Sequence, residues 1–181
     1  QGLLAQELKR VIPDIQSACS FEGYIQSTFQ TGEKINKMGG TFAGSDFFTM
    51  FGYRLLQGTP STALNIPSGI AISRSMAENF FGSPEQAMGK TIRYENKDNL
   101  IVTAVFENVT SNSSLYFDYL RTWGDYIREN DWVYHWGNTN PSTFIQLRRD
   151  ADPVKVEAAI KDFIHRYTPK LPGLKMELGM Q

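Results

Sequence analysis

The sequence has a single cysteine, Cys19, among 181 residues, so a disulfide within the chain is excluded. One thiol suits the cytosol as well as an extracytoplasmic domain without disulfides, and it does not decide the compartment. Cys19 lies in an alternating apolar and polar stretch between Ile15 and Phe21. This alternation is typical of a β-strand, so we expect Cys19 to be a buried strand residue rather than a reactive thiol.

An excess of charge of either sign is also absent, because 18 Lys and Arg residues stand against 19 Asp and Glu residues. Nucleic-acid binding requires concentrated positive charge to neutralise phosphates, so a nucleic-acid partner is not expected. For the same reason the sequence does not favour a basic face that lies on a membrane surface.

Long apolar runs are missing as well, and none approaches the ~20 residues that a transmembrane helix needs. The chain begins with Gln1 and Gly2, without an initiator methionine or a signal-peptide pattern. We therefore expect it to be a segment excised from a longer protein.

Catalytic and metal-binding residues are scarce, since His135 and His165 are the only histidines. Neither has a second His or Cys at metal-ligand spacing, and neither is placed by sequence beside a nucleophile and a carboxylate. Asp118, Asp125 and Asp131 could form a calcium or glycosidase site only if folding brought them together. We expect no enzyme activity, no metal and no cofactor.

Residues 69–112 contain the densest set of structural signals. An apolar strand ends at Ser73, which can cap a helix that Gly82 terminates. Ser83 and Pro84 then start a second short helix. Two β-branched runs, residues 91–94 and 100–107, flank a predicted four-residue turn at 96–99 and so indicate a β-hairpin.

Periodicity predicts further elements on both sides of this stretch. Asp152 and Pro153 start the helix with the clearest apolar stripe, which extends to Tyr167. The expected elements are a helix at 4–12, strands at 15–21, 24–30 and 34–43, a helix capped by Ser45, a surface loop at 57–68, strands at 115–120 and 142–148, a helix at 153–167 and a last strand at 174–178.

Six motifs in this order resemble the extracytoplasmic core domain of MacB/FtsX-like ABC-transporter permeases, over about residues 13–167. Thr110 stands where that family usually has proline, and Leu115 where it has histidine. The motifs are Ser45-Asp46-Phe47-Phe48 with Met50-Phe51-Gly52 and Leu55-Leu56-Gln57-Gly58, Ile70-Ala71-Ile72-Ser73, Ala77 with Phe80-Phe81-Gly82, Met88-Gly89-Lys90-Thr91-Ile92, Val102-Thr103-Ala104-Val105, and residues 109–114 with Phe117-Asp118.

The resemblance implies an α+β fold in the periplasm, on the outer face of the bacterial inner membrane. We expect two small lobes with short mixed sheets and packed helices, one formed by residues 1–50 and 140–181 and the other by the inserted residues 51–139. The implied function is to couple ATP hydrolysis by a cytoplasmic ATPase to movement outside the membrane. Implied partners are that ATPase, reached through transmembrane helices that flank this segment, a second permease copy, and a periplasmic adaptor, lipoprotein or peptide substrate.

Residues 121–141 hold all three tryptophans and fit two interpretations. The aromatic side chains could form a partner- or ligand-binding surface, for which Trp123, Trp132, Tyr134 and Trp136 are the candidates. Alternatively, they are a packed lid over the lobe beneath, since bulky aromatics bury enough area to fix a long connection. The alternative to a coupling domain is an extracytoplasmic ligand- or carbohydrate-binding sensor without a role in transport.

Overall fold

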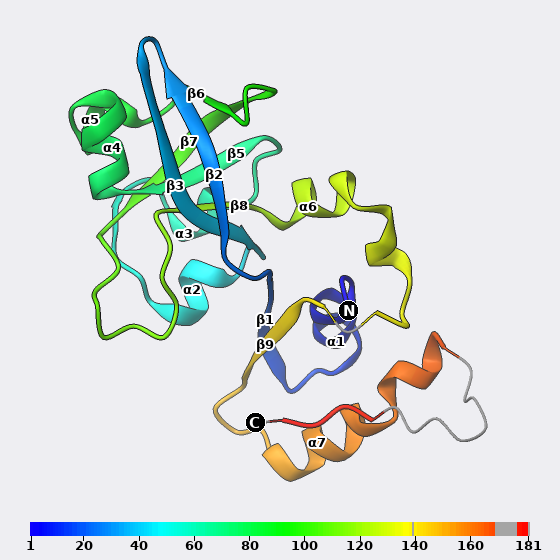
Figure 1. Ribbon diagram of the computed structural model, residues 1–181. Coiled ribbons are helices and arrows are strands. Elements are labelled where there is room, and N and C mark those ends of the chain that lie inside the picture. Colours follow the sequence, from blue (N-terminus) through cyan, green and yellow to red (C-terminus); the bar gives the residue numbers. More distant parts are fainter. Residues whose placement is uncertain (139, 169–176, 181) are drawn as a thin grey trace.

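The computed structural model describes residues 1–138, 140–168 and 177–180. All the strands that it describes belong to one mixed sheet, and helices pack against it (Figure 1). The predicted α+β class is therefore confirmed. The division into lobes of residues 1–50 with 140–181 and 51–139 stays a prediction.

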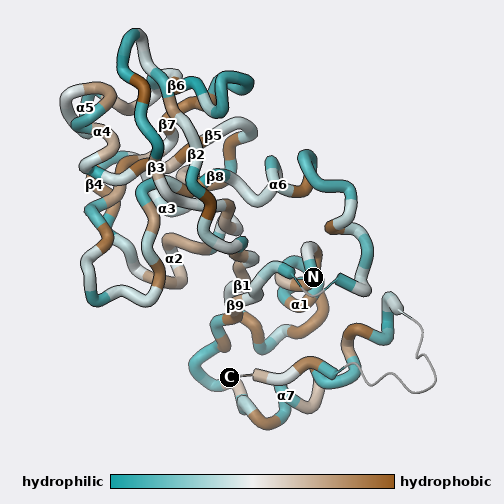
Figure 2. Tube along the Cα trace, in the orientation of Figure 1, coloured by the Kyte–Doolittle hydropathy of each residue, from teal (hydrophilic) through white to brown (hydrophobic). Residues whose placement is uncertain are grey.

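Six strands of the sheet form a closed ring of pairings. Going around it, β2 pairs with β6, β6 with β7, β7 with β5, β5 with β8, β8 with β3, and β3 with β2. The hairpin of β2 and β3 projects from one end of the molecule, and its tip is hydrophilic (Figure 2). These strands are β2 Ile25–Thr31, β3 Lys34–Ala43, β5 Gly69–Ser73, β6 Thr91–Tyr94, β7 Asp98–Phe106 and β8 Tyr119–Thr122.

Strands β1 (Ile15–Phe21) and β9 (Ser142–Leu147) extend the sheet beyond this ring. They pair with each other along their length, whereas β1 meets β3 through the single residue pair Phe21 and Ala43. A short strand, β4 (Leu55–Gln57), pairs with β7. The β1–β9 unit therefore joins the ring by a narrow connection.

Helices α4 (Arg74–Phe81) and α5 (Pro84–Ala87) cover one face of β5 and β7, as the capping signals predict. The Ser73 hydroxyl accepts a hydrogen bond from the Met76 amide, and the Ser83 hydroxyl accepts one from the Gln86 amide. The apolar positions of α4 pack on the strands because they recur on one helical face. This face carries Met76, Ala77 and Phe80.

Helices α2 (Phe47–Phe51) and α3 (Pro60–Ala63) cover the opposite face. The predicted cap Ser45 is wrong, because Asp46 occupies the capping position. Asp46 makes no capping bond, since its Oδ2 atom binds Lys9 Nζ and the Ala18 amide instead. The predicted loop at 57–68 also contains α3, whose end is buried.

Two strand boundaries differ from the sequence prediction. The β6–β7 turn has three residues, 95–97, because Tyr94 pairs directly with Asp98. Glu95 and Asn96 have positive φ angles, and the Glu95 carboxylate accepts a hydrogen bond from the Thr28 amide. The strand expected at 115–120 begins at Tyr119 and runs to Thr122, where it pairs with β3 and β5.

A third apolar cluster joins α1 (Leu4–Val11), β1, β9 and α7 (Pro153–Lys161). The Asp152 carboxylate caps α7 through the Val154 amide, as expected. The predicted helix at 153–167 ends as an α-helix at Lys161 and is followed by a 3₁₀ turn, η2 (Phe163–Arg166). Most of the strand expected at 174–178 lies outside the described residues.

Cys19 is fully buried in β1, which confirms its interpretation as a strand residue. Burial raises the pKa of the Cys19 thiol to about 12. Because the thiolate is the reactive form, Cys19 should not react with thiol reagents in the folded chain. A cysteine introduced at the surface can therefore be labelled selectively.

Candidate functional site

Trp123, the first candidate, is a buried packing residue at the start of α6 (Trp123–Glu129). Its indole Nε1 donates a hydrogen bond to the Gly2 carbonyl oxygen at 3.0 Å. Its ring stacks on Tyr126, with centroids 4.5 Å apart. Trp123 therefore links the N-terminal segment to α6.

The other candidates divide between two clusters and the surface. Trp132, in the 3₁₀ turn η1 (Asp131–Tyr134), meets Tyr126 edge-on in the cluster that contains Trp123. Trp136 stacks on Tyr167, with centroids 4.0 Å apart, in the cluster around α1 and α7. Tyr134 is 56% exposed. The structure thus brings Trp123 and Trp132 together, separates Trp136 from them, and uses all three in packing.

A buried charged network beneath α6 escaped the sequence interpretation. Arg121, on β8, is 1% exposed, and its guanidinium lies between the rings of Phe42 and Tyr94, 4.6 and 4.5 Å from their centroids. It pairs with Glu129 at 2.6 Å and lies 3.8 Å from Asp125. The spacing of four residues between these three charges is the signal that could have revealed the network.

Asp125 is completely buried and is held by several groups. Its carboxylate accepts hydrogen bonds from the Ser68 amide and pairs with Arg128 at 2.7 Å. Among the described residues, no group of three or more His, Cys, Asp and Glu side chains could hold a metal ion. Asp125 instead fixes α6 to the loop before β5.

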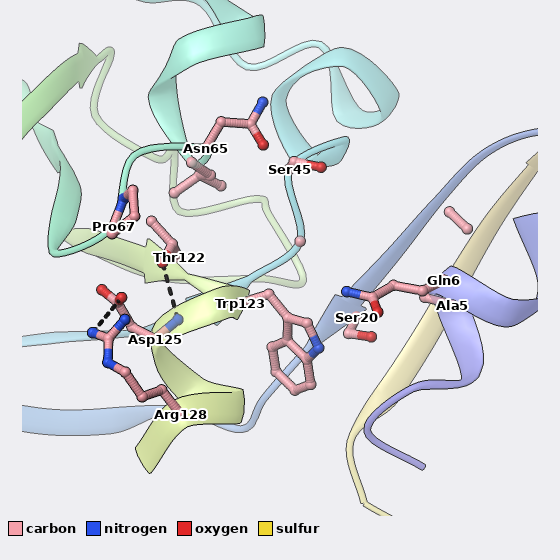
Figure 3. Close-up of a pocket in the computed structure, with 14 residues that line it drawn as sticks. Ala5, Gln6, Ser20, Ser45, Asn65, Pro67, Thr122, Trp123, Asp125 and Arg128 are labelled. Atoms are coloured by element: carbon pink, nitrogen blue, oxygen red, sulfur yellow. Dashed lines mark hydrogen bonds and ion pairs between the residues drawn. The ribbon is translucent and has the colours of Figure 1, made fainter. Parts of the chain in front are cut away.

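A cavity of about 310 Å³ lies beside this network, where α1 and β1 meet the six-stranded ring (Figure 3). Trp123 is the only tryptophan of the described chain that lines this cavity, and its indole lies between the α6 residues and those of α1 and β1. The other lining residues are Ala5, Gln6, Ala18, Ser20, Gly44, Ser45, Leu64, Asn65, Pro67, Thr122, Gly124, Asp125 and Arg128.

No segment of the described chain forms a helix with both the length and the apolar character needed to cross a bilayer. A search of curated protein sequences gives no match. The family model of the MacB-like periplasmic core domain, by contrast, matches residues 2–163.

Solved structures share the fold, among them the following three. A domain of a protein described as a permease, from Porphyromonas gingivalis, gives a TM-score of 0.72 at 23% identity, covering 91% of this chain and 70% of that one. The periplasmic region of MacB from Actinobacillus actinomycetemcomitans gives a TM-score of 0.64 at 17% identity, and the match covers 90% of this chain and 71% of that one. The extracellular domain of the noncanonic ABC-type transporter YknZ from Gram-positive bacteria gives a TM-score of 0.61 at 15% identity, and the match covers 98% of this chain and 87% of that one.

The matched family spans nearly the whole described chain, and the solved structures share its architecture, so the resemblance found in the sequence is confirmed. The chain belongs to the MacB-like periplasmic core domain family, the periplasmic domain of ABC-transporter permeases.

Proposed function

We propose that this domain couples ATP hydrolysis in the cytoplasm to movement outside the inner membrane. It works on the periplasmic face of that membrane, in a permease dimer driven by a cytoplasmic ATPase through transmembrane helices. The moved partner is an adaptor, a lipoprotein or a peptide substrate in the periplasm. The domain performs no reaction of its own. Family membership supports this proposal.

The observation that carries the proposal is the way α1 is fixed to the rest of the domain. The Gly2 carbonyl binds Trp123 on α6, and Lys9 pairs with Asp46 at 2.5 Å, just before α2. Asp46 in turn accepts a hydrogen bond from the Ala18 amide of β1. Because α1 and the residues before it are bonded across the cavity to α6 and to the residue before α2, a displacement of α1 moves these elements with it.

The position of the ends agrees with this role. The N-terminal residues and the C-terminal residues 177–180 both lie with α1, α7 and β9 in one half of the molecule, and the β2–β3 hairpin projects from the other half (Figure 1). Membrane segments attached at both ends would lie on one side of the domain. Motion applied at that side would reach the hairpin end.

Close packing makes such transmission effective, because a well-packed interior resists deformation. Aromatic rings fill the cluster under α2, where Phe47 contacts Phe48, Tyr53 and Phe117 with centroids 5.5–5.6 Å apart. A domain packed in this way moves as a body when one of its elements is displaced.

Spin-label distances measured through the nucleotide cycle test the coupling. Labels are placed on Glu33→Cys, at the hairpin tip, and on Lys155→Cys, on α7, in the full-length permease with its ATPase in lipid nanodiscs. Within one protomer, we expect the distance between the labels to be the same with ADP and with a non-hydrolysable ATP analogue. Between protomers, we expect the Glu33→Cys distance to change.

The distance within one protomer is measured on double-labelled protomers diluted with unlabelled ones. The distance between protomers is measured on dimers in which each protomer carries the Glu33→Cys label alone. Cys19 remains unlabelled because it is buried. A change of nucleotide that leaves the distance between protomers constant would contradict the coupling function.

Tyr134 is the best residue for testing the predicted partner surface, because Trp123, Trp132 and Trp136 also stabilise the fold. We expect Tyr134→Ala to weaken capture of a periplasmic partner by about fivefold or more, the effect of an interface residue worth over about 1 kcal/mol. The melting temperature should not change, as for most exposed substitutions.

A photo-crosslinking amino acid at position 134 of the full-length permease identifies what lies there. Position 116 is the matched control, since Tyr116 is equally exposed, at 59%, in the loop before β8. The same adducts at both positions, or none at 134, would contradict a partner-binding role for Tyr134.

A ligand-binding sensor remains the alternative function. The cavity beside Trp123 is the observation that favours a ligand-binding sensor.

A further inference from the structure

Strand β1 joins the six-stranded ring at the end of β3. The Glu22 amide, just after β1, donates a hydrogen bond to the Phe42 carbonyl oxygen at 3.1 Å. The Gly44 amide, just after β3, donates one to the Ser20 carbonyl oxygen at 2.9 Å. These bonds flank the single residue pair that the two strands share. The main-chain ladder that holds β1 on the ring is therefore short.

The carboxylate of Asp46 lies where the next hydrogen bond of this ladder is expected. Its Oδ2 atom accepts a hydrogen bond from the Ala18 amide at 3.1 Å. From bond to bond, the positions on β1 are 22, 20 and 18, and those on the other segment are 42, 44 and 46. The bonds of an antiparallel pair recur at every second residue in this way. The side chain thus extends the pairing past the point where the main chain turns away into α2.

The same oxygen atom also binds α1. Lys9 Nζ lies 2.5 Å from Asp46 Oδ2, and both side chains are partly exposed. An ion pair at the surface contributes little, whereas a hydrogen bond from the main chain to a charged carboxylate contributes more. Asp46 therefore connects α1 and β1 to the start of α2, and the bond to the Ala18 amide is the stronger part of this connection.

This connection leaves α2 without a capping side chain. An aspartate just before a helix usually has an extended backbone and accepts a hydrogen bond from an amide in the first turn. Asp46 instead has helical angles, φ −78° and ψ −4°, and makes no capping bond. A departure from such a local preference is expected where the residue serves another purpose. The contacts with α1 and β1 supply that purpose, and capping does not.

We propose that Asp46 is a latch that holds β1 and α1 on the ring, and that β1 separates locally from the end of β3 when the latch is lost. Gly44 and Ser45, just before Asp46, line the cavity of about 310 Å³, so packing leaves the junction partly open on that side (Figure 3). In the permease, the latch decides whether the ring follows α1, and this consequence alone rests on the proposed function.

Hydrogen exchange, measured by NMR on the isotope-labelled chain, tests the latch. The exchange rate of a protected amide reports how often its hydrogen bond opens. In Asp46→Ala, we expect the two junction amides, Glu22 and Gly44, to exchange about tenfold faster or more, the effect of losing a hydrogen bond to a charged group. Two control amides, Arg148 beside β1 and Val102 in the ring, are bonded on either side of the junction and should keep their rates.

Two substitutions in α1 separate the latch from the charge of the helix. Lys9→Met removes the ion pair and leaves the Ala18 bond in place. It should therefore accelerate the junction amides only about two- to fivefold, the effect of an exposed ion pair. Arg10→Met is the matched control, because Arg10 pairs with Glu7 of the same helix at 2.6 Å. It should leave the rates of the junction amides unchanged.

Unchanged exchange of the junction amides in Asp46→Ala would overturn the proposal. So would an equal acceleration of the control amides, because it would show a loss of global stability without local opening. Equal effects of Lys9→Met and Arg10→Met would overturn it as well, since the latch would then not hold α1. None of these results depends on whether the domain couples ATP hydrolysis to movement, so the two proposals fail separately.

Discussion

Replacing Arg121 with methionine is expected to lower the free energy of unfolding by about 3–5 kcal/mol, because removing one partner of a buried ion pair leaves its carboxylates uncompensated. Asp125 has no solvent exposure, and Glu129 gives Arg121 its closest ion pair, at 2.6 Å. The loss also removes the guanidinium from between Phe42 and Tyr94. The melting temperature should fall by about 6–20 °C, at about 2–4 °C per kcal/mol for a chain of this size.

Thermal and urea unfolding of the purified chain measure this change. Arg74→Met is the matched control, because Arg74 forms an ion pair with Glu107 at 2.9 Å in which both side chains are more than a third exposed. An exposed pair contributes about 0–1 kcal/mol. Equal losses from the two substitutions would show that burial of Arg121 does not set its contribution.

A second substitution tests the cause of the loss. Adding Asp125→Asn to Arg121→Met removes the buried negative charge and should recover part of the stability. Without recovery, the loss would come from packing against Phe42 and Tyr94 instead of from the unpaired carboxylate.

Local signals in the sequence predicted local structure well. Ser73, Ser83 and Asp152 act as helix caps because each bonds an amide two or three residues ahead. The start of α2 was predicted less well, because Asp46 and not Ser45 occupies the capping position. The Asp46 carboxylate makes no capping bond, since it binds Lys9 and Ala18, both far away in the sequence. Caps can therefore be predicted from sequence only where distant groups do not compete for the side chain.

The arrangement of the sheet was beyond sequence reasoning. The parallel pairing of β3 with β8 joins Gly40 to Tyr119, and the β2–β6 pairing joins Phe29 to Tyr94. Pairings between residues so far apart in the chain have no local pattern, because they depend on which strands lie side by side after folding.

The candidate site could be predicted only in part, because its contacts also join residues far apart in the chain. The tryptophans were identified from composition, but their partners, Gly2 for Trp123 and Tyr167 for Trp136, come from the two ends of the chain. The cavity combines residues from five separate segments. Its position follows from the packing of α1 and β1 on the ring, which only the structure reveals.

Gly40→Ala is expected to be at least as damaging as the loss of Arg121. Gly40 lies at the point where β3 pairs with β8, and a Cβ atom there would come within 2.2 Å of the Tyr119 carbonyl oxygen and 2.6 Å of its ring. The carbonyl belongs to the backbone of a central strand and cannot rotate away, so the two strands would have to separate. Overpacking of side chains alone costs about 1–3 kcal/mol, and a backbone clash should exceed this range.

Gly40 is thus required for the close approach of the β3 and β8 backbones, whereas a Cβ at Gly39 would meet the side chain of Tyr24. Gly23→Ala provides the control, because a Cβ at Gly23 meets no atom within 4 Å. Gly40→Ala should yield little folded protein or a melting temperature at least about 6 °C lower, as an effect above about 3 kcal/mol implies at about 2–4 °C per kcal/mol. Gly23→Ala should match the unmodified chain. If Gly40→Ala melts like Gly23→Ala, β3 and β8 do not pair at this residue, and the ring of six strands that supports α6 and the cavity is not closed.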